Sequence, residues 1–195
     1  ASVGTLLTGR VERSMVESVA TLQKAGAEVV IGGQPGGGNG YSFNNTLLKV
    51  SGDAFLADPE ALQTEAFGNE SLFIVAKDAD QAVEVARHFE GNLTGCVYSD
   101  SEGADESLYV RVVAILRKKV GRLLNDKMPT GVAVVPSMNH GGPYPSTGHP
   151  GFTAVGMPSS IVRFAMLESY DNVREHRLPP ELRDQNPSDI WRQID

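Results

Sequence analysis

The sequence predicts an α/β fold in which helices cover a mostly parallel, open sheet. Short apolar segments alternate along the 195 residues with segments whose apolar residues recur at helical spacing. This alternation is typical of strand–helix–strand units, which build parallel sheets. The hydrophobic content of 41% is enough for a packed core. A length of 195 residues suits one domain of ordinary size.

The first elements expected are a helix and a short buried strand. Apolar residues recur every three to four positions in the helix: Val11, Met15, Val19 and Leu22. Gly26 ends this pattern, and residues 28–31 then predict the strand.

The stretch from Gly32 to Gly40 is rich in glycine, but no amphipathic helix follows it to direct amide groups at a phosphate. We therefore expect a surface loop there and no nucleotide-binding turn.

Two strand–helix units are expected in the middle of the chain. Residues 73–76 predict a strand, and Asp78 then stands at the position of a helix N-cap. The stripe expected to be buried on that helix comprises Ala79, Ala82, Val83, Ala86 and Phe89. Residues 94–98 predict the next strand, and Ser107 is the expected cap of the helix after it.

The last elements expected are two strands, one helix and a tail. Residues 123–125 and 132–135 predict the strands, and Pro158 stands in the first turn of the helix. The sequence from Arg174 onward has three prolines and no clear period. It therefore predicts a domain over residues 1–173 and an irregular tail over residues 174–195.

Composition excludes several functional classes. A net charge of −7 argues against nucleic acid or an anionic membrane as a partner. No apolar run approaches the roughly 20 residues of a membrane span, and no signal peptide is recognised, so the cytoplasm is the expected location. A single cysteine excludes an internal disulfide and a cysteine-rich zinc site. His140 and His149 have no evident third ligand, so no metal site is predicted.

The stretch from Thr64 to Gly68 carries the most specific chemistry. Glu65 and Phe67 lie two residues apart, just before an apolar run. A carboxylate can accept two hydroxyl hydrogen bonds from a ribose, and an aromatic ring can lie against a flat cationic ring. The pair suits the nicotinamide-ribose end of an oxidised dinucleotide. The alternative is a surface glutamate beside a core phenylalanine at a strand entrance.

This stretch belongs to a longer series of segments that resembles the aldehyde dehydrogenase family. The matching segments occur in one order and include residues 46–48, 55–59, 62–69, 93–95, 123–132 and 140–147. The last two are similar to the branch that contains the 2-oxoglutarate semialdehyde (2,5-dioxopentanoate) dehydrogenases and related NADP-preferring enzymes. The resemblance implies that Glu65 binds the nicotinamide-ribose hydroxyls of NADP or NAD and that Phe67 packs on the nicotinamide side.

The resemblance also implies which parts are missing. Family members attack the aldehyde with a cysteine thiolate and hydrolyse the thioester with a glutamate-activated water, and both residues lie upstream of the Glu-x-Phe motif. No cysteine precedes Glu65 here, and Cys96 lies downstream in an apolar strand, where a buried structural cysteine is expected. We therefore expect no catalytic residue in this chain. It is expected to be a fragment, inactive alone, whose upstream part carries the nucleophile and the dinucleotide-binding domain.

The resemblance places residues 137–147 at the aldehyde entrance. His140 and Tyr144 are candidates for substrate contact there, although a turn held by the adjacent glycines and proline explains the same segment. The chain departs from these patterns at two places. Asn69 replaces the proline that the family usually has there, which bears on the exit geometry of the Glu65 loop. Met166-Leu167 replaces an Arg-Pro pair of the semialdehyde branch, which weakens the match to that branch.

The expected partners are a small-molecule aldehyde, the upstream part of the same enzyme and further copies in a homo-oligomer. Without the upstream part, the chain is expected to expose a sheet edge or an apolar patch. The alternative function is a non-catalytic α/β scaffold or oligomerisation module. The sequence leaves the aldehyde, the choice between NAD and NADP, and the subunit number open.

Overall fold

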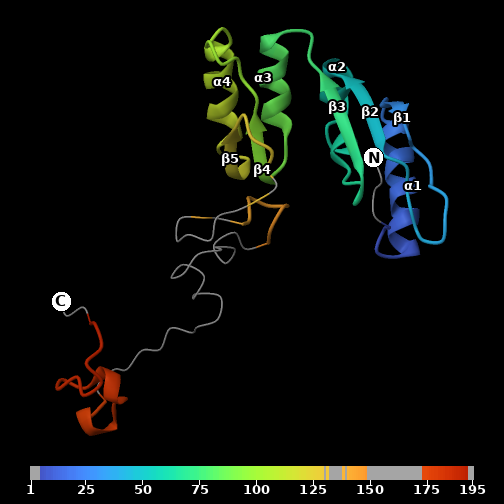
Figure 1. The fold of residues 1–195 in the computed structure, drawn as a ribbon. Helices are drawn as coiled ribbons and strands as arrows, with labels where there is room; N and C mark the ends of the chain where they lie inside the picture. The colour runs from blue at the N-terminus through green and yellow to red at the C-terminus, as the bar shows by residue number, and fades with distance from the viewer. Residues whose placement is uncertain (1–4, 130, 132–137, 139, 149–172, 193–195) are drawn as a thin grey trace. The chain divides into compact units, whose positions relative to one another are not determined.

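The computed structural model describes residues 5–129, 131, 138, 140–148 and 173–192. The chain divides into two units, residues 1–160 and 161–195, and each is described by itself. The first unit contains four α-helices and five strands among its described residues, and Figure 1 shows their order along the chain. It is an α/β arrangement with parallel strand pairs, which confirms the predicted fold class.

The first helix, α1, spans Gly9–Lys24. It begins where the Thr8 side chain accepts a hydrogen bond from the Val11 amide. The predicted apolar positions Met15, Val19 and Leu22 are all buried. Amphipathic spacing therefore decides both the helix and the face that it packs against the core.

Three strands form one sheet in the order β1-β2-β3, with β1 at Glu28–Ile31, β2 at Thr46–Ser51 and β3 at Glu70–Val75. The pair β1 and β2 is antiparallel, whereas β2 and β3 are parallel, with Thr46 opposite Glu70. The prediction that residues 28–31 are buried is wrong, because β1 is an edge strand and Ile31 is 63% exposed. The strand β2 was not predicted as an element.

A short helix and a turn connect β2 to β3. The helix α2 spans Gly52–Ala57 and is capped by Ser51, and a 3-10 helix, η1, follows at Ala61–Gln63. Phe55 on α2 is fully buried and meets Phe89 edge to face, with ring centroids 5.8 Å apart. The largest fully buried side chains in the described residues are Phe43, Phe55, Met15, Leu22, Leu48 and Val19. They form one core between α1 and one face of the three-stranded sheet.

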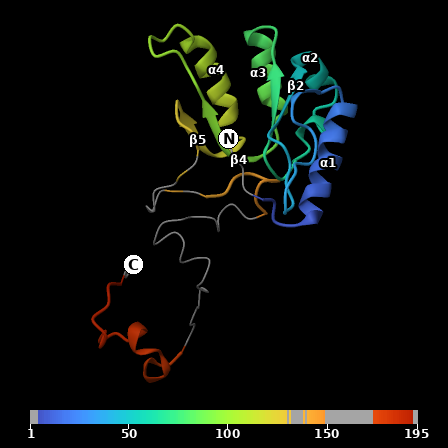
Figure 2. The ribbon, with the colours of Figure 1, turned by 45° about the vertical axis from the view of Figure 1, so that its right-hand side comes forward.

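Two strand–helix units complete the first unit. They comprise α3 at Ala79–His88, β4 at Asn92–Val97, α4 at Glu106–Leu116 and β5 at Val120–Asn125. The strands β4 and β5 pair in parallel as a separate two-stranded sheet. The helices α3 and α4 pack side by side, as Figures 1 and 2 both show.

The N-cap at Asp78 is confirmed, because its carboxylate accepts from the Gln81 amide at 2.8 Å. The prediction of Ser107 as a cap is wrong, since the N-cap is Asp105, two residues earlier, and Ser107 lies inside α4.

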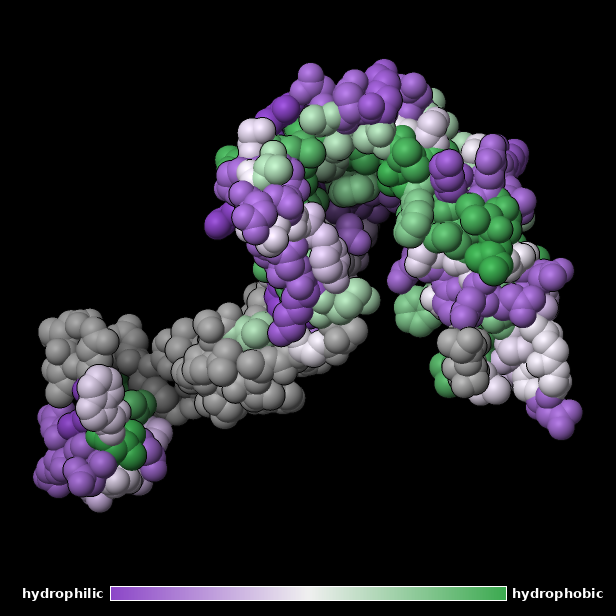
Figure 3. All heavy atoms as spheres, turned by 45° about the horizontal axis from the view of Figure 1, so that its top comes forward, coloured by the Kyte–Doolittle hydropathy of each residue, from purple (hydrophilic) through white to green (hydrophobic). Residues whose placement is uncertain are grey.

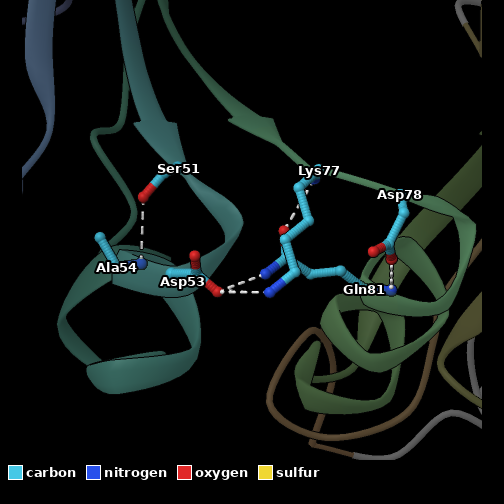
Figure 4. A network of polar contacts seen from close by, with 6 residues as sticks. All are labelled: Ser51, Asp53, Ala54, Lys77, Asp78 and Gln81. Atoms are coloured by element: carbon cyan, nitrogen blue, oxygen red, sulfur yellow. Dashed lines mark hydrogen bonds and ion pairs between the residues drawn. The ribbon is translucent and has the colours of Figure 1, made fainter.

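A polar network joins the carboxyl ends of β2 and β3 (Figure 4). The Gln81 side chain is buried, accepts from the Lys77 amide at 2.8 Å and donates to the Asp53 carboxylate. Lys77 Nζ also lies 3.4 Å from the same carboxylate oxygen. These contacts fix the start of α3 beside α2.

The glycine-rich loop after β1 leads into a strand, which confirms that no helix follows it. Gly32 and Gly33 both have φ near +79°, a conformation that side chains rarely adopt. Pro35 and Phe43 form an isolated antiparallel bridge across the loop. The loop is therefore a folded turn between two antiparallel strands.

The described part of the second unit, residues 173–192, contains two 3-10 helices at Glu175–Arg177 and Pro180–Leu182. The strand predicted at residues 132–135 and the helix predicted from Pro158 lie outside the described residues. Among the helices that the structure describes, none has the length and apolar character needed to cross a membrane.

Candidate functional site

The candidate site lies at a groove between β3 and β4. The groove has a volume of about 740 Å³. One wall carries Leu72 and Ile74 of β3, and the other is formed by residues 91–96, which include most of β4. Figure 3 shows this hollow, with hydrophobic surface beside it. Glu65, from the loop before β3, and Pro145 and Ser146 also line the groove.

The loop that carries Glu65 and Phe67 is anchored by the residues between and after them. Ala66 is 9% exposed and belongs to the core. A side chain at Gly68 would meet Met15 Sδ at 2.6 Å, so this glycine lets the loop lie directly on α1. The Ser18 hydroxyl donates to the Glu65 carbonyl at 3.4 Å. With Ala66 turned inward, the side chains on both sides of it are exposed.

Glu65 and Phe67 therefore both present their side chains outside the core. Glu65 lines the groove, and Phe67 is 70% exposed. Phe67 is not among the groove-lining residues. The alternative interpretation of Phe67 as a core residue is wrong. A free carboxylate and a free aromatic face, two residues apart, are the groups that a ribose and a nicotinamide ring would need.

The neighbouring carboxyl group of Glu70 has a different environment. One of its carboxylate oxygens is buried and has no hydrogen-bond partner. Burial raises the pKa of Glu70 above its ordinary value, because the charged form is poorly solvated. The two glutamates near the start of β3 thus differ in solvent exposure: Glu65 is exposed, whereas Glu70 is half-buried.

The segment 140–148 packs against the amino ends of β4 and β5. The Pro143 and Tyr144 carbonyls lie where a side chain at Gly91 would point, and the Gly141 carbonyl lies where one at Gly121 would point. Within the segment, Ser146 Oγ donates to the Pro143 carbonyl at 2.6 Å. The segment is therefore a turn that reaches the groove because glycines allow close backbone approach.

His140 and Tyr144 lie on this turn with exposed side chains, and Tyr144 is 82% exposed. The structure thus brings the segment that carries both candidates to the same groove as Glu65, through Pro145 and Ser146. Neither His140 nor Tyr144 itself lines the groove. Their contact with a substrate stays a prediction.

Cys96 is half-buried rather than buried, and it lines the groove. Its thiol donates to the Lys127 carbonyl at 2.8 Å. The expectation of a fully buried cysteine is wrong because β4 is an edge strand of its sheet. Within the described ranges, no three histidine, cysteine, aspartate or glutamate side chains are grouped as a metal site would require.

Sequence reasoning missed Gln63 as a positioning residue. Its side-chain amide donates to the Pro59 and His88 carbonyls at 2.8 and 3.0 Å, and its oxygen accepts from the Glu90 amide at 2.8 Å. It therefore ties the loop before β3 to the connection between α3 and β4. A glutamine in a polar stretch gives no periodic signal, so only the fold reveals this role.

We expect the substitution Gly121→Ala to displace the segment 140–148. The new methyl group would occupy the position of the Gly141 carbonyl oxygen, and such overpacking costs about 1–3 kcal/mol. Urea unfolding should show this loss, and limited proteolysis should become faster between residues 140 and 148. Gly131→Ala is the control, because nothing lies within 4 Å of its added methyl group. Equal behaviour of the two variants would show that this packing is unimportant.

The comparisons with known proteins agree with one another. The profile of the aldehyde dehydrogenase family matches residues 1–135. The α-ketoglutaric semialdehyde dehydrogenase 2 of Azospirillum brasilense is 39% identical over 146 residues, which are 75% of this chain and 27% of that protein.

Two solved structures are similar to the fold. The Δ-pyrroline-5-carboxylate dehydrogenase of Mycobacterium tuberculosis has a TM-score of 0.65 at 23% identity, over 90% of this chain and 32% of that one. The 1-pyrroline-5-carboxylate dehydrogenase of Thermus with bound NAD has a TM-score of 0.54 at 27% identity, over 71% and 25%. The chain thus spans roughly a quarter to a third of the proteins that it matches.

Proposed function

Because the chain belongs to the aldehyde dehydrogenase family, we propose that it is part of an NAD(P)-dependent enzyme that oxidises an aldehyde to a carboxylic acid. The observation that carries this proposal is the placement of Glu65 and Phe67. One loop presents both side chains outside the core, and the carboxylate lines a groove. When bound, the cofactor supplies the hydride acceptor.

The exposed groups fit the nicotinamide-ribose end of NAD or NADP. Glu65 would accept hydrogen bonds from the two ribose hydroxyls, which a charged acceptor binds more strongly than a neutral one. The Phe67 ring, 70% exposed, would pack on the nicotinamide side. Ser18 and Gly68 keep the loop on α1, so these two side chains need little reorganisation.

The proposed substrate is a short oxo-acid semialdehyde such as 2-oxoglutarate semialdehyde. The support is the 39% identity to the Azospirillum brasilense protein, whose name specifies that activity. His140 and Tyr144 are the proposed substrate contacts, since their turn reaches the groove that Glu65 lines. The proposed setting is a cytoplasmic homo-oligomer, with NADP or NAD as the cofactor.

We propose that the chain contributes no catalytic residue to the enzyme. It spans about a quarter of the Azospirillum brasilense protein, and the remaining part of the enzyme would supply the thiolate nucleophile and the dinucleotide-binding domain. The chain's share of the work is to hold one end of the cofactor and to border the aldehyde entrance.

Glu65→Gln in the complete enzyme is expected to raise the KM for NAD(P) roughly 10- to 100-fold. The amide keeps the size of the side chain but removes the charge that strengthens hydrogen bonds to the ribose hydroxyls. Steady-state kinetics at saturating aldehyde and a cofactor titration by fluorescence would both measure the effect.

Glu60→Gln is the matched control for that experiment. Glu60 is exposed, lies five residues earlier and does not line the groove. An unchanged cofactor affinity in Glu65→Gln, or an equal loss in Glu60→Gln, would refute the assigned role of Glu65.

A further inference from the structure

The loop that presents Glu65 and the turn at residues 140–148 are joined by a short series of contacts that begins at the side chain of Gln63. Gln63 lies two residues before Glu65, at the end of η1, and it is half-buried and lines the same groove. The residue before it, Leu62, is 3% exposed and belongs to the core. The core therefore holds the backbone that carries Gln63, while the Gln63 side chain borders the groove.

The amide group of Gln63 both donates and accepts. Its nitrogen donates to the Pro59 carbonyl at 2.8 Å and to the His88 carbonyl at 3.0 Å. Its oxygen accepts from the Glu90 amide at 2.8 Å. His88 is the last residue of α3, and Glu90 follows it in the connection to β4. Because hydrogen bonds weaken quickly when their geometry changes, one planar amide fixes this connection relative to η1.

The same connection supports the turn at residues 140–148. A side chain at Gly91 would occupy the place of the Pro143 carbonyl oxygen. From the turn, a side chain at Gly142 would meet the Asn92 carbonyl oxygen. Glycine thus allows close approach on both sides, and backbone packs on backbone. No long side chain lies at these two points to absorb a shift, so a displacement of the connection displaces the turn.

The turn is closed by hydrogen bonds of its own. The Ser146 and Thr147 hydroxyl groups donate to the Pro143 and Gly142 carbonyls, each at 2.6 Å. A turn that is closed by such internal bonds shifts as one unit. The position of Tyr144, which the turn carries with an exposed side chain, therefore follows that of the connection between α3 and β4.

We propose that Gln63 is a positioning residue that couples the cofactor end of the site to the aldehyde entrance. Gln63 sets the place of the connection between α3 and β4 relative to the loop of Glu65, and the turn packs on that connection. A cofactor bound by Glu65 therefore orders the turn, and an aldehyde bound at the turn orders the loop. Such coupling is reciprocal, because each ligand changes the affinity for the other by the same factor. The inference rests on the proposed function, since it takes Glu65 as the cofactor contact.

Hydrogen–deuterium exchange of the complete enzyme measures this coupling without turnover. Saturation with NAD(P) should slow exchange at the amides of residues 140–148 about fivefold or more. In Gln63→Met, which keeps the length of the side chain and removes its amide group, saturation should slow the same amides by less than about twofold. Gln23→Met is the matched control, because Gln23 is exposed on α1 and does not line the groove. It should respond to the cofactor as the unsubstituted enzyme does.

The substitution Gln63→Asn gives an independent kinetic measurement, and it replaces Gln63→Met in the exchange experiment if that variant does not fold. Asparagine keeps the amide group but is one methylene shorter, so it cannot reach both the His88 carbonyl and the Glu90 amide. The KM for NAD(P) and the KM for the aldehyde should both rise about 5- to 10-fold. The kcat should change less than about threefold, because Gln63 touches no reacting atom. A purely structural role would lower the melting temperature but leave both KM values and the exchange response in place.

The outcomes separate this proposal from the assignment of Glu65. If Glu65→Gln leaves the cofactor affinity unchanged, both the assignment and the coupling fail. If Glu65→Gln weakens cofactor binding, three results would still exclude the coupling through Gln63. They are no protection of residues 140–148 by NAD(P) in the unsubstituted enzyme, equal protection in Gln63→Met, and a rise in only one of the two KM values in Gln63→Asn.

Discussion

The 195-residue chain by itself is expected to oxidise no aldehyde in the presence of NAD or NADP. Formation of the covalent intermediate requires a thiolate, and Cys96 is the chain's single cysteine. Its thiol donates a hydrogen bond to the Lys127 carbonyl at 2.8 Å. Absorbance of the reduced nicotinamide during incubation with a semialdehyde would measure turnover.

The complete enzyme serves as the positive control for this measurement, and the chain with Cys96→Ser serves as the negative one. Turnover by the chain that disappears in Cys96→Ser would contradict the proposal and make Cys96 a nucleophile. Turnover that persists in Cys96→Ser would contradict the thiolate mechanism for this chain.

Phe55→Ala is expected to destabilise the chain by about 3–5 kcal/mol, a large part of the stability of a domain. Phe55 is fully buried on α2, and its ring meets Phe89 edge to face at 5.8 Å. Truncation leaves a cavity where α2 and the connection after α3 meet the core. Urea unfolding followed by circular dichroism would measure the loss.

Phe73→Ala is the matched control, because Phe73 is 58% exposed on β3. It should change the stability of the isolated chain by less than about 1 kcal/mol. Similar losses in the two variants would show that the core is not centred where the structure places it.

The sequence predicted elements best where one face of a helix is buried. The spacing of Met15, Val19 and Leu22 predicted α1, and Asp78 predicted the start of α3. Both signals are local, since they depend on side chains within one or two turns. The Glu65-Ala66-Phe67 motif was visible for the same reason, as a short stretch of specific residue types.

Predictions that depended on neighbouring strands were less successful. Residues 28–31 read as a buried strand, yet β1 is an exposed edge. Cys96 read as buried, yet it lines a groove. An apolar run indicates a strand but does not reveal which neighbours cover it, because strand pairing joins residues that are distant in the sequence.

By itself, the sequence determined the buried face of α1, the start of α3 and the resemblance to aldehyde dehydrogenases. Only the tertiary structure decided that Ala66 turns inward so that Glu65 and Phe67 face outward, that Gln63 ties two connections together, and that β3 and β4 stand apart. The physical reason is the distance along the chain between the residues that interact. Amphipathic period and capping act between near neighbours in the chain, whereas exposure and open strand edges depend on packing between distant segments.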